Sequence, residues 1–415
     1  MFSENTLRGL IILLVLSVAF GQGMLALLCT LLLLTAGLAW LWDRWSLARL
    51  SYERELSHPR SFPGDEVELI IRIANRKPLP LAMLDVRDVI PAGLEVVGYD
   101  LKLDREGRQM LHRSTSMRWY ERLTWRYRVR CLARGAYRFG PAQLESGDPF
   151  GFYRTFREFP QRTSLVVYPR LLPLEELGLP ARHPIGDLRM RQLIRDPLRT
   201  IGIRDYHPED PIKDVHWSAT ARTGTLQTRI YESTTALDLA IFLDLDTFER
   251  YWEGIDEDQV ERLISAAATV ASAGLADGYA VGLYVNGAPA EFEQLVRLPP
   301  GRSPAQLERI METLARLTPY SITPMARMLY VGVGNLPWGA TLLLISSVAP
   351  SATRAVLMRQ REHGRNVVWL YLGEDEAPVV PGVLVRHAPP RSDWRGNGHE
   401  QWARPNARPV EEERR

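Results

Sequence analysis

The residues whose types and spacing could support chemistry lie in two stretches of the second half of the chain. Asp244 lies near the end of an apolar run at 236–245, and Asp246 directly follows that run. That run has the composition of a parallel strand buried on both faces. Ligands bind beyond the carboxyl ends of such strands in open α/β sheets, so these two carboxylates occupy a place where a binding site is expected.

The second stretch, Gly202–Arg222, is rich in polar and aromatic residues. A charge network around Tyr206 and Trp217 is expected from Arg204, Asp205, Glu209, Asp210, Lys213 and Asp214. One interpretation is a solvated loop that leads into a strand at 225–231. The other is a docking surface anchored by Trp217 and Arg222, because Trp and Arg are frequent interface hot spots.

Common catalytic signatures are absent from the sequence. It has no G-x-x-x-x-G-K-[ST] phosphate loop, no G-x-S-x-G elbow and no H-E-x-x-H zinc motif. Gly332-Val333-Gly334 begins like a dinucleotide loop, but Pro337 stands where the third glycine belongs. We therefore predict no catalytic residue, no cofactor and no enzyme activity.

Composition excludes several protein classes. The 415 residues are 46% hydrophobic and 24% charged, which is typical of globular domains and not of disordered or fibrous chains. The formal net charge of +2 provides no overall attraction for nucleic acid. The only cysteines, Cys29 and Cys131, lie far apart, so a disulfide scaffold is not expected and a reducing compartment is favoured.

An apolar stretch at 7–42 is interrupted by Gly21-Gln22-Gly23. Because it is too long for one membrane span, residues 1–50 are predicted to form a two-helix transmembrane hairpin. Trp40, Trp42 and Trp45 resemble an interfacial aromatic belt. Basic residues flank both ends of the stretch and are missing from its bend, which predicts a cytoplasmic-membrane protein with both termini in the cytoplasm.

Residues 51–170 are predicted to form an antiparallel β-sandwich of immunoglobulin type. Apolar and polar residues alternate at 65–75 and at 123–131, the pattern of half-buried strands, and shorter strands are expected at 84–89 and 94–99. Arginines fill the polar face of 123–131. They are interpreted either as a patch for anionic lipid or nucleic acid, or as a solvated face that prevents aggregation.

Residues 236–388 are predicted to form a doubly wound α/β domain. Strands are expected at 236–245, 280–285, 341–346 and 366–372, with helices at 256–275, 304–316 and 352–363 between them. Ser303, Pro304 and Gln306 have the spacing of a capping box. The final residues, 389–415, lack periodicity and are predicted to be a disordered tail.

The segment around Tyr206 resembles the signature of a bacterial family called domain of unknown function 58. The resemblance is carried by Arg204, Tyr206, Pro208 and Asp210, then by Trp217, Ala221 and Arg222. Upstream blocks at 146–151 and 167–169 agree as well. The resemblance implies a domain similar to von Willebrand factor A, and association with MoxR-type AAA+ ATPases and transglutaminase-like membrane proteins. Residues 171–235 are then a linker that carries the family signature.

This sequence departs from the family pattern at three positions. Glu209 replaces a glycine, Lys213 an arginine, and His216 the aspartate before the tryptophan. Since glycine tolerates positive φ, Glu209 implies a changed or strained turn. The carboxylate lost at His216 could leave an arginine unpaired.

An A-type domain binds Mg²⁺ through Asp-x-Ser-x-Ser and residues of later loops. Here Asp246 and Phe248 stand in place of the two serines, Thr323 corresponds to the loop threonine, and Ser346-Ser347 ends the later strand. The resemblance therefore implies a vestigial metal site, with Asp244 satisfied by backbone amides.

These observations predict a membrane-anchored, non-enzymatic adaptor. Its cytosolic domains would bind a MoxR-type AAA+ ATPase, and a transglutaminase-like membrane protein, through Arg204, Tyr206, Asp210, Trp217 and Arg222. One alternative is a metal-dependent hydrolase or transferase that uses Asp244 and Asp246. Another is an envelope-linked structural protein whose β domain binds the main ligand.

Overall fold

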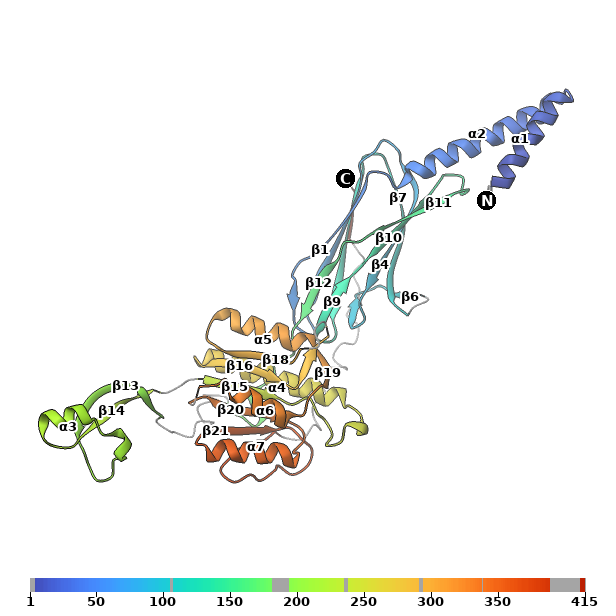
Figure 1. Ribbon diagram of the computed structural model, residues 1–415. Coiled ribbons are helices and arrows are strands. Elements are labelled where there is room, and N and C mark those ends of the chain that lie inside the picture. Colours follow the sequence, from blue (N-terminus) through green and yellow to red (C-terminus); the bar gives the residue numbers. More distant parts are fainter. Residues whose placement is uncertain are drawn as a thin grey trace. The chain divides into compact units, whose positions relative to one another are not determined.

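The computed structural model describes residues 4–104, 107–180, 194–234, 238–290, 294–337, 339–388 and 411–414. The chain divides into two compact units, which are shown in Figure 1. The first comprises Met1–Tyr168 with Ala403–Arg415, and the second comprises Pro169–Trp402.

Two apolar helices, α1 (Glu4–Ala19) and α2 (Gly23–Ser46), open the first unit and pack against each other. They turn at Gly21, whose φ of 71° favours glycine. Among the described residues, α2 is the one helix long and apolar enough to cross a membrane. Core helices and signal sequences can share that property, but only 17% of its most apolar window is buried. The 16 residues of α1 rise about 24 Å, less than the roughly 30 Å of a bilayer core.

Antiparallel strands are found in residues 51–170, as expected, and with β1 and β23 they form two five-stranded sheets. The first has the order β1-β3-β8-β23 with β5 also on β8, and the second has the order β11-β10-β4-β7-β6. A third, three-stranded sheet has the order β2-β12-β9. The strands are β1 (Leu50–Leu56), β2 (Arg60–Ser61), β3 (Glu66–Asn75), β4 (Leu81–Ile90), β5 (Leu94–Val96), β6 (Lys102–Leu103), β7 (Gln109–Met117), β8 (Arg122–Cys131), β9 (Gly135–Phe139), β10 (Ala142–Gly147), β11 (Arg154–Phe159), β12 (Thr163–Val167) and β23 (Glu411–Arg414).

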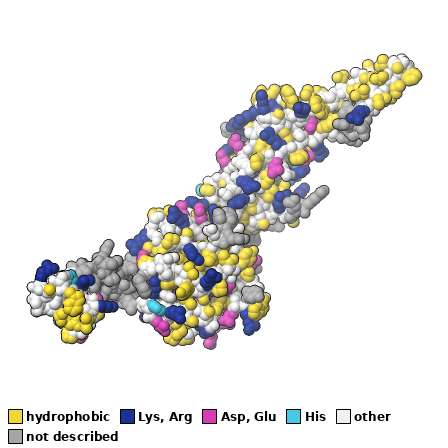
Figure 2. All heavy atoms as spheres, viewed as in Figure 1, with side chains coloured by type: hydrophobic (Ala, Val, Ile, Leu, Met, Phe, Trp, Pro, Cys, Tyr) yellow, Lys and Arg dark blue, Asp and Glu magenta, His cyan; other side chains and the backbone are white. Residues whose placement is uncertain are grey.

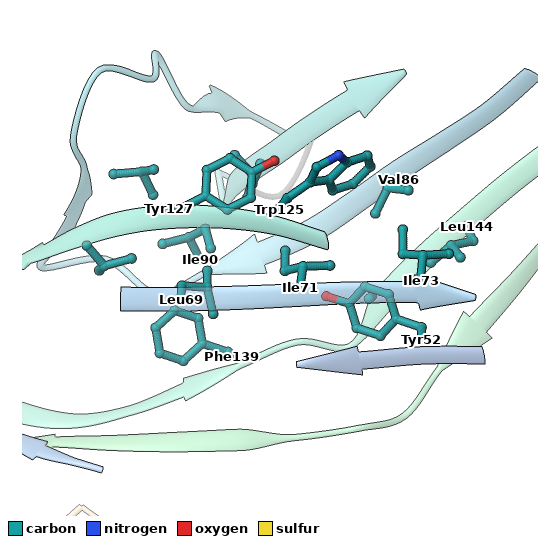
Figure 3. Close-up of a cluster of buried hydrophobic side chains, with 14 of the residues drawn as sticks. Tyr52, Leu69, Ile71, Ile73, Val86, Ile90, Trp125, Tyr127, Phe139 and Leu144 are labelled. Atoms are coloured by element: carbon teal, nitrogen blue, oxygen red, sulfur yellow. The ribbon is translucent and has the colours of Figure 1, made fainter. Parts of the chain in front are cut away.

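The period-two patterns correctly predict β3 and β8. These strands pair antiparallel, with Leu69 opposite Tyr127 and Ile71 opposite Trp125. All four side chains are buried in the apolar core that the sheets share, as Figure 3 shows. Burial of these large side chains is the main stabilising contribution in this unit.

A buried ion pair crosses this core. The Arg54 guanidinium lies 2.5 Å from Asp88 Oδ1, and both side chains are fully buried. Tyr52 donates a hydrogen bond of 2.7 Å to the second carboxylate oxygen. The guanidinium also donates to the carbonyls of Phe139 and Gln161, so its charge is neutralised and its donors are used.

The arginines of β8 are paired with acidic residues. Arg126 contacts Glu68, Arg128 contacts Glu66, and Arg130 contacts both Glu66 and Glu95. These cross-strand pairs favour the interpretation of a solvated face, because the positive charge of those three arginines is largely compensated.

The predicted disordered tail needs a correction at its end. Residues 389–410 lie outside the described residues, but Glu411–Arg414 form β23, which pairs antiparallel with β8. The open edge of β8 offers unpaired backbone groups, and such an edge can recruit a short strand that has no sequence periodicity.

Part of the second unit is an irregular β-hairpin. Its strands are β13 (Ile194–Asp205) and β14 (Gln227–Thr234), and the 3₁₀ turn η2 (Ile212–Asp214) and helix α3 (Trp217–Thr223) lie between them. The sequence predicted only one strand here, at 225–231. A loop interpretation of 202–222 is therefore wrong, since hydrogen-bonded elements occupy much of that stretch.

The rest of the second unit is built on a six-stranded sheet of order β18-β16-β15-β20-β21-β22, in which only β18 is antiparallel. Helices α6 and α7 cover the face that carries Ala240 and Phe242, and α4 packs with α5. The elements are η1 (Leu174–Leu177), β15 (Asp238–Leu243), η3 (Tyr251–Glu253), α4 (Glu257–Ala276), β16 (Ala280–Val285), β17 (Gly287–Pro289), β18 (Val296–Gly301), α5 (Pro304–Arg316), β19 (Leu317–Ser321), α6 (Met325–Val333), β20 (Thr341–Ser346), α7 (Ser351–Glu362), β21 (Asn366–Tyr371) and β22 (Leu384–His387).

Most predicted elements of this sheet are confirmed, and so is the cap of α4, where Asp256 accepts a hydrogen bond from the Gln259 amide. The prediction of a capping box at the start of α5 is wrong. Ser303 makes no side-chain cap bond, and Gln306 instead donates to the carbonyls of Val281 and Pro299. The Gln306 side-chain amide satisfies these two backbone carbonyls, which need a hydrogen-bond donor where they are shielded from water.

Candidate functional site

The first candidate region is the turn that holds three predicted partner-binding residues. Arg204 Nη2 lies 2.7 Å from Asp210 Oδ1, and the Tyr206 hydroxyl donates to the Asp210 carbonyl at 3.2 Å. Asp210 Oδ2 accepts from the His207 amide at 3.0 Å. That backbone bond, followed by the Arg204 bond, lowers the pKa of Asp210. The structure thus brings Arg204, Tyr206 and Asp210 into one locked turn.

Glu209 does not strain this turn. The Asp210 amide donates to the His207 carbonyl, which places Pro208 and Glu209 at the two central positions. Among the described residues, only Arg49 and Tyr120 are non-glycine residues at positive φ. The turn therefore accepts Glu209 without a left-handed conformation, contrary to the expectation of strain.

His216 makes a helix-capping hydrogen bond in the place of the aspartate of the family pattern. It is the N-cap of α3, and its Nδ1 accepts from the Ala219 amide at 3.1 Å. An aspartate at an N-cap would accept the same kind of bond. Arg222, at the other end of α3, donates to the Ser218 carbonyl at 3.3 Å, so the expected unpairing of an arginine finds no support at this residue.

The hairpin exposes an unusual amount of apolar surface. Ile212 is 71% exposed and Trp217 is 65% exposed, although both belong to ordered elements. Ile203, Leu226 and Ile230 are exposed as well. Figure 2 shows apolar side chains gathered on this segment. Exposed apolar patches on folded elements are typical of interaction surfaces.

The second candidate region is the carboxyl end of β15. Asp244 is buried, and its Oδ1 accepts from Asn286 Nδ2 at 2.7 Å and from the Asp246 amide at 3.1 Å. Asn286 follows β16, the neighbouring parallel strand, and its Oδ1 accepts from the Leu245 amide. Sequence analysis missed Asn286, although its place directly after a predicted strand is a usable signal.

Asp246 is held by side chains from other loops. Its Oδ1 accepts from the Ser321 hydroxyl and its Oδ2 from Asn286 at 3.4 Å. Ser347 donates to its backbone carbonyl at 3.1 Å. Thr323, the predicted loop threonine, is half-buried, and the hydroxyl that reaches Asp246 comes from Ser321, two residues earlier.

Burial raises the pKa of Asp244 well above its usual range, and the nearby charge of Asp246 raises it further. A hydrogen bond between the two carboxyl groups acts in the same direction. Asn286 and the Asp246 amide only partly oppose these effects. Asp244 is therefore expected to hold its proton to a higher pH than an exposed aspartate does.

These residues do not fit a bound Mg²⁺ well. Hydrogen bonds already engage three of the four carboxylate oxygens, and Phe248 supplies no oxygen. In the part of the chain that the structure describes, no group of three or more His, Cys, Asp or Glu side chains is placed to hold a metal ion.

Residues 202–330 match a family model described as "Protein of unknown function DUF58". The expected resemblance to this family is confirmed over these residues. The matched residues include the hairpin turn, α3 and the Asp244–Asn286 cluster, so both candidate regions lie in the DUF58 part of the chain.

The chain is also similar to an uncharacterized protein, YeaD, of Bacillus subtilis. The two are 24% identical over 233 residues, which cover 55% of this chain and 54% of YeaD. The match therefore spans about half the length of this relative.

Solved structures match a smaller part. A CARDB domain from Pyrococcus furiosus has 14% identity and a TM-score of 0.20, covering 28% of this chain and 91% of its own. A cohesin module from Clostridium perfringens has 11% identity and a TM-score of 0.20, covering 28% and 96%.

Proposed function

We propose that this protein is a membrane-anchored, non-enzymatic adaptor. Its β13–β14 hairpin, with η2 and α3, binds a protein partner in the cytosol. The observation that carries the proposal is the exposure of Ile212 and Trp217 on elements that are otherwise locked by hydrogen bonds. A rigid surface with an aromatic anchor loses little conformational entropy on binding, which favours recognition.

The strand order of the second unit supports a fold similar to von Willebrand factor A. Along the chain, β15, β16, β18, β20, β21 and β22 are strands one to six, so the spatial order is 3-2-1-4-5-6. This is a doubly wound order, in which the reversal of direction lies between β15 and β20. The two antiparallel sheets around one core likewise support an immunoglobulin-like sandwich in the first unit.

In this proposal α1 and α2 form a hairpin in the cytoplasmic membrane with both chain ends in the cytoplasm. Arg44 and Arg49, at the end of α2 and just after it, support this orientation. The short α1 fits if Thr6 and the turn at Gly21 lie in the interface, or if the bilayer thins locally.

The proposed partner is a MoxR-type AAA+ ATPase, with a transglutaminase-like membrane protein as a further member of the assembly. The ATPase would supply the energy of nucleotide hydrolysis, which fits a chain without a phosphate loop. Hydrogen bonds already engage both Asp246 carboxylate oxygens and one of Asp244, which argues against their use in metal-dependent hydrolysis.

Co-purification tests this proposal directly. The full chain, in detergent, is mixed with a purified MoxR-type ATPase from the same organism. The double variant Trp217→Ala with Arg222→Ala is compared with Tyr330→Ala, which removes a side chain of similar exposure from α6. We expect the wild type and Tyr330→Ala to retain the ATPase and the double variant to lose it.

Each opposite result has its own meaning. Retention by the double variant would show that the hairpin is not the docking surface. No retention by the wild type would show that the partner is misidentified.

A further inference from the structure

One end of the β-sandwich gathers the junction with α2 and three turns. The register places Leu50 opposite Asn75, Leu81 opposite Met117, and Gly147 opposite Arg154. The β3–β4, β7–β8 and β10–β11 turns therefore lie at the end where α2 enters β1. Helix α2 also contacts β10 and β11.

These turns expose large aromatic side chains. Trp119 and Tyr120, in the β7–β8 turn, are 65% and 66% exposed, and Phe150, in the β10–β11 turn, is 51% exposed. Phe156 of β11 is 79% exposed. Figure 2 shows apolar side chains at the end of the sandwich from which α2 leaves. Four such residues at one end exceed the scattered exposure that is normal on a soluble surface.

The β10–β11 turn is built to hold its aromatic residues outward. Asp148 is buried, and its carboxylate accepts from the Phe150 amide at 2.8 Å and from the Tyr153 amide at 2.6 Å. A Cβ at Gly147 would lie 2.7 Å from the Tyr153 carbonyl oxygen. The rings of Phe150 and Phe152 stack at 5.8 Å. This turn is the block at 146–151 that the proposed adaptor surface does not use.

The turns are tied to the end of α2. The Lys77 ammonium, in the β3–β4 turn, donates to the carbonyls of Ser46 and Ala48, and Arg157 donates to the Leu47 carbonyl at 3.4 Å. The Tyr120 amide donates to the Lys77 carbonyl at 3.2 Å. The depth of α2 in a membrane would therefore fix the depth of the aromatic turns.

The charge at this end suits an anionic surface. Its exposed basic residues include Arg44, Arg49, Arg76, Arg118, Arg122, Arg154 and Arg157, and of these Arg154 also lies 3.5 Å from Glu145. Two of its carboxylates are engaged in local bonds: Asp148 within its turn, and Glu121 with the amide of Arg118. Arginines beside exposed aromatic rings are typical of surfaces that lie at the headgroup level of a bilayer.

We propose that this end of the sandwich is a second membrane-binding surface. Trp119, Tyr120, Phe150 and Phe156 lie in the headgroup region of an anionic leaflet, and the surrounding arginines contact lipid phosphates. The inference rests on the proposed anchoring by α2, with which the surface is continuous. The sandwich is then held at the membrane at a fixed height and does not swing on a flexible tether.

Site-directed fluorescence tests this inference on the full chain. Single cysteines are introduced as Trp119→Cys or Phe156→Cys and labelled with an environment-sensitive dye, because Cys29 and Cys131 are buried. Leu103→Cys is the matched control. Leu103 is 68% exposed but lies at the other end of the second sheet, where β6 pairs with Met110 and Gln109. Each protein is reconstituted into nanodiscs of phosphatidylcholine with or without phosphatidylglycerol.

We expect lipids that carry a spin label near the headgroup to quench the dyes at 119 and 156 at least about threefold more than the dye at 103. The difference should be larger with phosphatidylglycerol, and the double variant Arg76→Glu with Arg118→Glu should remove that dependence on lipid charge.

Equal quenching at all three positions, in protein that floats with the bilayer, would overturn this inference and leave the anchoring intact. A blue-shifted dye without lipid quenching would indicate a protein contact and would overturn it too. Failure of the full chain to float with the bilayer would overturn the anchoring and the inference together.

Discussion

Asp88 of the sandwich and Asp244 of the α/β unit are both buried carboxyls, yet their surroundings differ. Asp88 has a buried guanidinium 2.5 Å away and a tyrosine hydroxyl on its second oxygen. Asp244 has an amide, a backbone N–H and a second carboxyl, and burial raises its pKa. In general, an opposite charge favours the ionised form of a buried acid, and burial without one favours the neutral form. The first carboxyl has an opposite charge as its partner, whereas the second has another carboxyl beside it at the end of β15.

Breaking the Asp88 pair should have the largest effect. Arg54→Met leaves an uncompensated buried carboxylate, and we expect the free energy of unfolding to fall by about 3–5 kcal/mol. Urea denaturation of the detergent-solubilised chain measures it. The matched control is Arg54→Met with Asp88→Leu, which removes both charges and should recover most of the loss. A loss below about 1 kcal/mol in the single variant would contradict this account.

The variant Asp244→Asn should differ from the wild type in how its stability depends on pH. The raised pKa means that the folded state holds a proton that the unfolded state releases above about pH 4. Wild-type stability should therefore fall relative to the variant, by up to about 1.4 kcal/mol per pH unit, as the pH rises from there toward the folded pKa. Thermal melts of both proteins between pH 4 and 8 check this. Parallel curves would mean that Asp244 is ionised.

Lys77 is a buried basic group, and no acidic side chain among the described residues forms an ion pair with it. Burial lowers its pKa to about 8. The folded state then binds fewer protons than the unfolded state between pH 8 and 10.5, so stability should rise across that window. Lys77→Met should abolish the rise and, through the lost bonds to two carbonyls, cost about 1–2 kcal/mol at pH 7. An unchanged pH profile in the variant would contradict the assignment.

Asp210→Asn should give the smallest effect. The pKa of Asp210 is lowered, so the charged carboxylate stabilises the turn above its unfolded pKa, and that contribution is lost as the pH falls. Because the group is exposed, we expect only local loosening. Hydrogen exchange at the His207 amide, which donates to Asp210, should be faster in the variant at pH 7, while exchange in β20 stays the same.

The sequence predicted the elements whose pattern is set by burial. Alternation in β3 and the apolar run of β15 follow from which faces meet the core, and both are found where expected. Hydrogen-bond partners that come from distant segments were missed. Asn286 and Ser321 reach Asp244 and Asp246 only because the sheet brings three loops to one edge, and periodicity carries no information about that meeting.

In the β13–β14 hairpin the candidate functional residues were easier to predict than the secondary structure. Its signature residues could be named, but β13 and α3 could not be predicted, since α3 has only seven residues and depends on the cap that His216 supplies. Helix α2 was the easiest element to predict, because length and apolarity alone define a candidate membrane span.

The central claim is that the β13–β14 hairpin binds the partner and that Asp244 and Asp246, at the carboxyl end of β15, do not. The most direct measurement is the affinity of a purified MoxR-type ATPase for the full chain in nanodiscs, for wild type, Trp217→Ala and Asp244→Asn. The account predicts roughly 30-fold weaker binding for Trp217→Ala, the loss of an aromatic hot spot, and wild-type affinity for Asp244→Asn. Wild-type affinity for Trp217→Ala together with lost binding for Asp244→Asn would contradict it.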